Sequence, residues 1–156
     1  MARVHIGGDH AAYELLVDLV AFLESEGHEV TNHGAHAYDA LDDYPVFCLR
    51  AAEAVAADRG SFGVVLGGSG NGEQMAANKV AGIRAALCYS EELARLAREH
   101  NDAQVISIGA RMSTSEEARS MVRVFLGTPF SGDERHARRI GMMRAYEDDG
   151  TLPPLP

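Results

Sequence analysis

Residues 62–79 read FGVVLGGSGNGEQMAANK, and this stretch decides the fold class. Phe62 to Leu66 is a short apolar run, which is typical of a strand buried on both faces. Four glycines follow within the six residues 67–72, and a helical pattern runs from about Asn71 to Lys79. A strand that leads through a glycine-rich turn into a helix is the unit from which parallel sheets are built.

The same alternation continues toward both ends of the chain. Strands are predicted at Arg3–Gly8, His28–Asn32, Phe62–Leu66, Gly82–Cys88 and Ala103–Ile108. Helices are predicted at Ala11–Glu26, 46–57 after Pro45, 71–79, Ser90–Glu99, Glu116–Leu126 and Asp133–Asp148. Five alternations predict an α/β fold with a five-stranded parallel sheet and helices on both faces. We expect a single domain over residues 1–156, with an irregular tail at 149–156.

Composition narrows the class of protein further. The 156 residues are 46% hydrophobic and 24% charged, which is ordinary for a globular domain, and the formal net charge is −9. An acidic chain is a poor match for nucleic acid, and its apolar runs are too short for a membrane helix. The chain starts without an export signal pattern, and its two cysteines form neither a disulfide framework nor a zinc motif. We therefore expect a cytoplasmic protein.

Ligands of parallel sheets bind beyond the carboxyl ends of the strands, so the loops at that edge are the first place to look. Asp9 and His10 directly follow the first predicted strand. Asp9 also suits a plain helix cap, whereas His10 has less structural reason to stand there.

The glycine-rich loop 67–72 is the strongest chemical signal. Its main-chain amides suit an anion, and it matches neither the P-loop nor the dinucleotide fingerprint. Glu73 follows, and a carboxylate beside an oxyanion cradle suits proton abstraction next to a carbonyl. The alternatives are a tight turn and an ordinary glutamate in a first helical turn.

Further candidates lie later in the chain. His100 and Asn101 precede the fifth predicted strand, Arg111 follows it, and Arg135 and Arg139 share a helix face. Histidine suits acid–base chemistry, and arginine suits phosphate, although polar helix ends and solvated faces explain the same residues. Tyr44 either lines the site or packs. His5, His28, His33 and His36 lack metal-ligand spacing, so we expect no metal.

These candidates comprise a base, an acid, a loop that can hold an anion and arginines that can hold a phosphate, and no cofactor motif accompanies them. Such a set suits the interconversion of an aldose phosphate and a ketose phosphate. This reaction moves a proton between neighbouring carbons through an enediolate and needs no redox cofactor.

Four segments resemble type B ribose-5-phosphate isomerase, over Arg3 to Tyr146. They are GGDHAAYELL (7–16), DYP (43–45), GGSGNGEQMAANKVAGIRAALC (67–88) and REHNDAQVISIGAR (98–111). The resemblance implies a Rossmann-like α/β/α sandwich and a homodimer, sometimes a tetramer, with its site at the interface. It also implies a C-terminal helix that reaches the partner, and no metal or cofactor.

The resemblance also implies a role for individual residues. Asp9 and His10 would meet the substrate, and Asn101 would bind its hydroxyls. The loop of Gly68, Ser69, Gly70, Asn71 and Gly72 would stabilise the anion, with Ser69 relaying a proton. His100 would open the sugar ring, assisted by His136 or Asp9. The phosphate would be held by Arg111, Arg135 and Arg139, some of them from the partner chain.

One position departs from much of that family. Many members carry the base as a cysteine where this chain has Gly67, whereas a subgroup uses a glutamate at the position of Glu73. We therefore expect Glu73 to be the base in a ribose 5-phosphate isomerase. Alternatives are an isomerase of allose 6-phosphate, galactose 6-phosphate or a tetrose phosphate, a nucleotide- or flavin-binding module, and a sugar-phosphate sensor.

Overall fold

The computed structural model describes residues 1–155 and contains one sheet of five parallel strands. The strands are β1 (Arg3–Gly8), β2 (Glu29–Asn32), β3 (Phe62–Gly67), β4 (Ala85–Leu87) and β5 (Val105–Gly109), in the order β2-β1-β3-β5-β4. The helices are α1 (Tyr13–Ser25), α2 (Tyr44–Ala57), α3 (Asn71–Ala77), α4 (Glu91–Asn101), α5 (Ser115–Gly127) and α6 (Glu134–Asp149). The predicted fold class is thereby confirmed.

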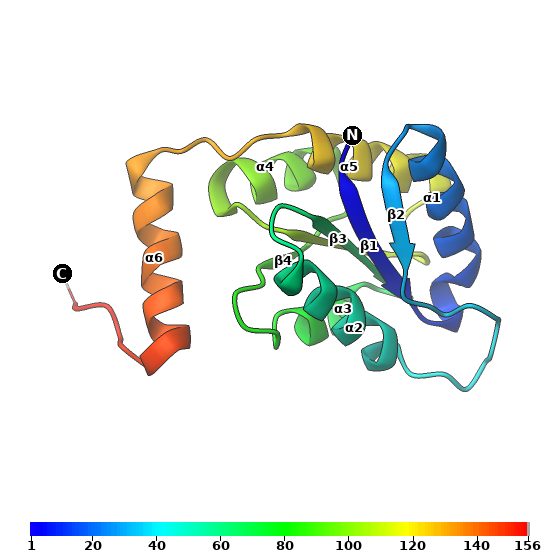
Figure 1. Ribbon diagram of the computed structural model, residues 1–156, viewed down its shortest axis with the longest axis horizontal. Coiled ribbons are helices and arrows are strands. Elements are labelled where there is room, and N and C mark those ends of the chain that lie inside the picture. Colours follow the sequence, from blue (N-terminus) through cyan, green and yellow to red (C-terminus); the bar gives the residue numbers. More distant parts are fainter. Residues whose placement is uncertain (156) are drawn as a thin grey trace.

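Helices cover both faces of the sheet (Figure 1). On one face α1, α4 and α5 bury the larger apolar core, whose fully enclosed members include Ile6, Leu19, Ile106 and Phe125. On the other face α2 and α3 bury a smaller core around Val65 and Ala77. Burial on both faces explains why β3 and β5 are largely apolar rather than alternating, with the buried Ser107 as the polar exception in β5.

The edge strand β4 is shorter than predicted, because it begins at Ala85 rather than Gly82. Gly82 takes a positive φ of 81°, which bends the chain before the strand starts. The Asn78 side chain then accepts from the Ala85 main-chain N–H and donates to its carbonyl, at 2.8 and 2.9 Å. Helix α3 also stops two residues earlier than predicted, because the main chain tightens into three-residue turns there, with the Lys79 and Val80 N–H groups donating to the Ala76 and Ala77 carbonyls.

The start of α1 differs in detail from prediction, whereas the start of α4 agrees with it. A 3₁₀ turn at His10–Ala12 precedes α1, because Asp9 caps it by accepting from the Ala11 N–H at 3.0 Å. The predicted cap at Ser90 is confirmed by a 3.2 Å bond from the Leu93 N–H. The last predicted helix is present as α6, and the described residues after it, 151–155, lie in no helix or strand, whereas Pro156 of the predicted tail lies outside the described residues.

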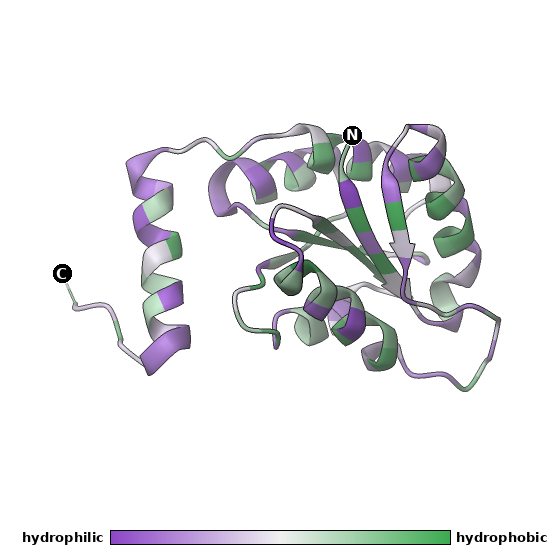
Figure 2. Ribbon diagram, viewed as in Figure 1, coloured by the Kyte–Doolittle hydropathy of each residue, from purple (hydrophilic) through white to green (hydrophobic). Residues whose placement is uncertain are grey.

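Helix α6 stands at the side of the molecule, joined to the rest through α4 (Figure 1). Hydrophobic residues recur along it although it lies apart from both cores (Figure 2). Met142, Met143 and Tyr146 are all exposed, and His136 is its one buried residue. Within residues 1–155, none of the helices combines the length and the apolar character needed to cross a bilayer.

Candidate active site

Three strand ends meet at the carboxyl edge of the sheet. Gly8 at the end of β1 is in register with Leu66 of β3, and Gly67 of β3 is in register with Gly109 of β5. A Cβ at Gly8 would lie 2.7 Å from the Leu66 carbonyl oxygen, so only glycine allows this approach. The loops that carry Asp9, Glu73 and Arg111 are therefore brought together, as the sequence predicted.

Glu73 is the most deeply buried carboxylate of the chain part described here, with 4% of its surface exposed. Its carboxyl lies directly beside Gly67, where a Cβ would approach Glu73 Oε1 to 1.8 Å. A side chain at position 67 would therefore displace the Glu73 carboxyl from the place that it occupies here. Glycine at position 67 leaves this space to the carboxyl.

The electrostatic surroundings of Glu73 favour a base. Burial raises the pKa of Glu73, and the nearby charge of Asp9 adds to this, while main-chain amides of Glu73 and Gly70 oppose it. Its Oε2 atom is buried and has no hydrogen-bond partner among residues 1–155. Burial likewise raises the pKa of Asp9, which is 7% exposed. A buried carboxylate with an unused oxygen at a ligand edge is suited to accept a proton.

The glycine-rich loop is fixed by its neighbours rather than free. Gly70 has a positive φ of 84°, its carbonyl accepts from Ser107 Oγ at 2.7 Å, and a Cβ there would meet Leu87 at 2.6 Å. The loop after β5 donates from the Arg111 N–H to the Gly68 carbonyl at 3.0 Å. Glycine is thus required at Gly70 for both conformation and space.

Two predicted substrate-binding side chains lie against this loop. A Cβ at Gly68 would be 3.2 Å from an Arg111 guanidinium nitrogen, and one at Gly72 would be 2.6 Å from the Tyr44 ring. Ser69 and Asn71 are exposed, and Ser69 Oγ accepts from the Asn71 N–H at 3.3 Å. Arg111, Tyr44 and the loop hydroxyl therefore surround the space in front of the loop.

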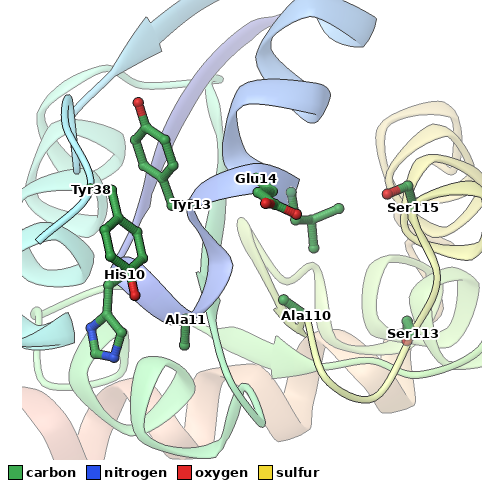
Figure 3. A pocket seen from close by; sticks show the side chains of 9 residues that line it. His10, Ala11, Tyr13, Glu14, Tyr38, Ala110, Ser113 and Ser115 are labelled. Carbon is green, nitrogen blue, oxygen red and sulfur yellow. The ribbon is translucent and has the colours of Figure 1, made fainter. Parts of the chain in front are cut away.

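His10 lies at the same edge, beside a cavity of about 590 Å³. Figure 3 shows His10 and Tyr38 side by side, with Tyr13 farther along the wall. The Nδ1 atom of His10 lies 2.7 Å from Asp42 Oδ1, and the His10 N–H donates to the same oxygen at 2.9 Å. Asp42 was not among the predicted site residues, because the sequence shows it only as one polar residue of the segment DDYP (42–45).

The other predicted residues lie at the opposite edge of the sheet. Helix α4 starts after β4 and returns to the start of β5, so His100 and Asn101 lie where the strands begin. The Asn101 carbonyl accepts from Arg84 Nε, just before β4, at 2.8 Å. The five residues of β5 put about 13 Å between the two edges. Within one chain these two groups do not form one site.

His136 holds the start of α6 against this second group. Its ring stacks on that of His100, with centroids 4.2 Å apart and an interplanar angle of 11°. Burial lowers the pKa of His136, and the neighbouring His100 adds to this. Arg135 and Arg139 are exposed, one turn apart on α6.

The site arginines differ from many arginines elsewhere in the chain. Arg84, Arg95, Arg98 and Arg119 pair with carboxylates. By contrast, Arg111, Arg135 and Arg139 form no ion pair with any residue between positions 1 and 155. The same holds for Arg50, Arg59, Arg138 and Arg144. Free guanidinium groups are available to an external anion.

Asp9, His10 and Asp42 are the described residues whose geometry could hold a metal, with one ligand atom each within 4.8 Å. Asp9 Oδ1 accepts from the Ala11 N–H, and Asp42 Oδ1 is engaged with His10 Nδ1, so protein partners already occupy one oxygen of each carboxylate and one ring nitrogen. We assign no metal to them. His5 and His33 bond to each other at 3.0 Å, and His28 accepts from the Ala2 N–H.

The chain is similar to known proteins over nearly its whole length. A sequence model of the family described as "Ribose/Galactose Isomerase" matches residues 4–143. "Ribose-5-phosphate isomerase B" of Mycolicibacterium paratuberculosis is 54% identical over 154 residues, covering 99% of this chain and 97% of the relative. The Escherichia coli protein of the same name is 36% identical, covering 94% and 97%.

Solved structures agree with this similarity. Type B ribose 5-phosphate isomerase from Trypanosoma cruzi superposes with a TM-score of 0.91 at 42% identity, covering 97% of this chain and 99% of that one. Ribose-5-phosphate isomerase B from Mycoplasma genitalium, solved with bound ribulose-5-phosphate, has a TM-score of 0.91 at 36% identity, covering 94% and 97%. On its sequence and its fold, this chain belongs to the ribose/galactose isomerase family.

Proposed function

We propose that this protein interconverts ribose 5-phosphate and ribulose 5-phosphate through an enediolate. The observation that carries the proposal is the buried Glu73 carboxyl at the carboxyl edge, with its unpartnered oxygen and its raised pKa. The family membership and the names of the relatives support the same reaction.

The chemistry is a proton transfer between C1 and C2 of the sugar. Glu73 takes the proton from C2 of the aldose and returns it to C1, so the carbonyl moves from C1 to C2. Main-chain amides of the loop 68–72 stabilise the negative oxygen of the intermediate, and Ser69 relays the hydroxyl proton between the two oxygens. Arg111, beside Gly68, holds the phosphate.

The site is completed by a second copy of the chain. The amino-edge group, defined as His100, Asn101, Arg135, His136 and Arg139, lies too far from Glu73 to share a substrate with it in one chain. In a homodimer, the amino-edge group of one protomer meets the carboxyl-edge loops of the other. There, His100 and His136 open the sugar ring, Asn101 binds hydroxyls, and Arg135 and Arg139 grip the phosphate.

The surface next to β4 supports this arrangement. Strand β4 lies at the edge of the sheet. Exposed apolar side chains lie on α3, just after β4 and on α6, and they are Met75, Tyr89, Met142, Met143 and Tyr146. Apolar groups gathered beside an uncovered strand edge favour association with another chain. Both cysteines are free, buried thiols, which fits our proposal of a reducing, cytoplasmic setting.

A coupled assay tests the proposed reaction. The purified protein is given ribose 5-phosphate, allose 6-phosphate, galactose 6-phosphate and erythrose 4-phosphate, and kcat/KM is compared. We expect the largest value for ribose 5-phosphate. A larger value for a six-carbon or four-carbon sugar would reassign the substrate, and calorimetric binding of ribose 5-phosphate without turnover would indicate a sensor instead.

A further inference from the structure

Asp42 belongs to the long polar segment between β2 and α2, and this segment crosses the carboxyl edge of the sheet. Its side chain is only 10% exposed, although the segment around it is largely exposed. One oxygen, Oδ1, bonds to both the main chain and the ring of His10. The solubility of the loop does not explain why this carboxylate is buried among exposed residues and directed at one histidine.

The second oxygen of this carboxylate is unusual. Asp42 Oδ2 is buried, and no group within the described chain donates a hydrogen bond to it. A buried carboxylate with an unused oxygen is costly unless a positive charge lies nearby. The ring of His10, 2.7 Å from Oδ1, is the nearest group that can supply this charge.

The groups that adjoin the His10 ring or line its cavity come from three segments, and none of these groups is a cation. They are Asp9 before the 3₁₀ turn, Asp42 and Tyr38 from the polar segment, and Tyr13 and Glu14 from α1. The hydrogen bond to Asp42 raises the pKa of His10, and the charges of Asp9 and Asp42 act in the same direction, against partial burial. His10 is therefore favoured as an imidazolium.

The contact also fixes which ring atom is available. Because Nδ1 is engaged by Asp42, Nε2 is the nitrogen left for a ligand. His10 lines the cavity together with Tyr38, whose ring meets it edge to face at a centroid distance of 6.3 Å (Figure 3). Asp42 on one side and Tyr38 on the other restrict the rotation of the imidazole.

We propose that Asp42 is a positioning residue, which holds the His10 ring so that its Nε2–H donates a hydrogen bond to the sugar phosphate. This inference rests on the proposed function and adds a residue to its binding machinery. Asp42 touches no substrate itself. The competing explanation is that Asp42 merely ties down the polar segment through the His10 N–H, which predicts effects on stability alone.

The test compares Asp42→Asn with Asp42→Glu, and Asp43→Asn serves as the control. Asp43 is adjacent, exposed and makes no side-chain capping bond, so its variant removes the same charge from the same segment. NMR titration of the His10 ring nitrogens gives the tautomer and the direction of the pKa change without substrate. Steady-state kinetics with ribose 5-phosphate give KM and kcat over a range of pH.

For Asp42→Asn we expect a KM about tenfold higher, with a smaller change in kcat, because a charge-assisted hydrogen bond is lost. The pKa of His10 should fall, so kcat/KM should decline at a lower pH than in the unsubstituted protein. Asp42→Glu should restore part of both effects, and Asp43→Asn should show neither. In a His10→Asn background, Asp42→Asn should add little.

Two results would overturn the inference. One is a His10 ring in the unsubstituted protein that titrates at or below the ordinary histidine value, or that carries its neutral proton on Nε2; this measurement requires no variant to fold. The other is an unchanged KM in a folded Asp42→Asn variant. If the protein turns over none of the sugar phosphates, the proposed reaction fails, while the ring titration still decides whether Asp42 controls His10.

Discussion

The carboxyl edge and the amino edge of this sheet are built in different ways. At the carboxyl edge, Glu73 and Asp9 are buried, the glycine loop is bonded to β5, and each polar group has a defined place. At the amino edge, Arg135 and Arg139 project from α6, which is held by the stacked pair of His100 and His136 near its start and by a bond from the Gly82 N–H to Glu147 near its end. The first region consists of packed and bonded groups, whereas the second presents exposed arginines that form no ion pair among residues 1–155.

This difference indicates a division of labour between the two edges. Burial raises the pKa of Glu73, which suits the proton transfer that we propose for it. Exposed arginines that form no ion pair among residues 1–155 suit the capture of a charged sugar phosphate from solvent. In the proposed dimer, the carboxyl edge of one protomer would supply the base and Arg111, and the amino edge of the other would supply ring opening and further phosphate contacts.

The largest effect is expected for Glu73→Gln, which keeps the shape of the side chain and removes its ability to accept a proton. We expect kcat to fall by about a thousandfold, with KM within a few-fold, because the base acts in the transition state. Glu53→Gln on the exposed face of α2 is the control and should keep full activity. A normal kcat in the Glu73→Gln variant would show that Glu73 at the carboxyl edge is not the base.

At the other edge, Arg135→Ala combined with Arg139→Ala should raise KM for ribose 5-phosphate by about tenfold or more, with a smaller change in kcat. The cause is the loss of charged bonds to the phosphate. Arg59→Ala, at an exposed arginine that also forms no ion pair among residues 1–155, is the control. If KM stays the same in the double variant, the phosphate is bound elsewhere.

A mixed dimer sharpens the comparison further. One protomer carries Glu73→Gln and the other carries Arg135→Ala with Arg139→Ala, and two affinity tags isolate the heterodimer. Since one of its two sites is then fully intact, it should regain about half of the unsubstituted activity at low substrate concentration. No recovery would mean that both edges of a site come from the same chain.

The smallest expected effect concerns stability. A carboxyl whose pKa is raised by folding stabilises the protein at low pH, and this contribution is lost as the pH rises through the raised pKa. Glu73→Gln should therefore melt at a higher temperature than the unsubstituted protein at pH 7, and the difference should shrink toward pH 4. Equal melting temperatures at pH 7 would show that Glu73 is not strained by burial.

Much of the fold could be predicted, because its signals are local. Apolar runs and caps such as Ser90 placed all five strands and the helices, and the fold class followed from their alternation. The start of β4 was missed, since it depends on the Asn78 side chain bonding to Ala85. Of the site, Asp9, His10, Glu73 and the loop were predictable from their place after strands. Asp42 was not, because a polar residue in a long loop gives no signal of burial.

The parallel sheet, the glycine loop and the residue types of an isomerase were predictable from the order of the residues, because periodicity, strand ends and motifs are local patterns. Folding was needed to place the Glu73 carboxyl in the space beside Gly67 and to bring Asp42 to His10 across 32 positions. It also decided that the predicted site is divided between two edges of the sheet. These contacts join segments that are far apart in the sequence, and such segments become neighbours only when the folded chain packs.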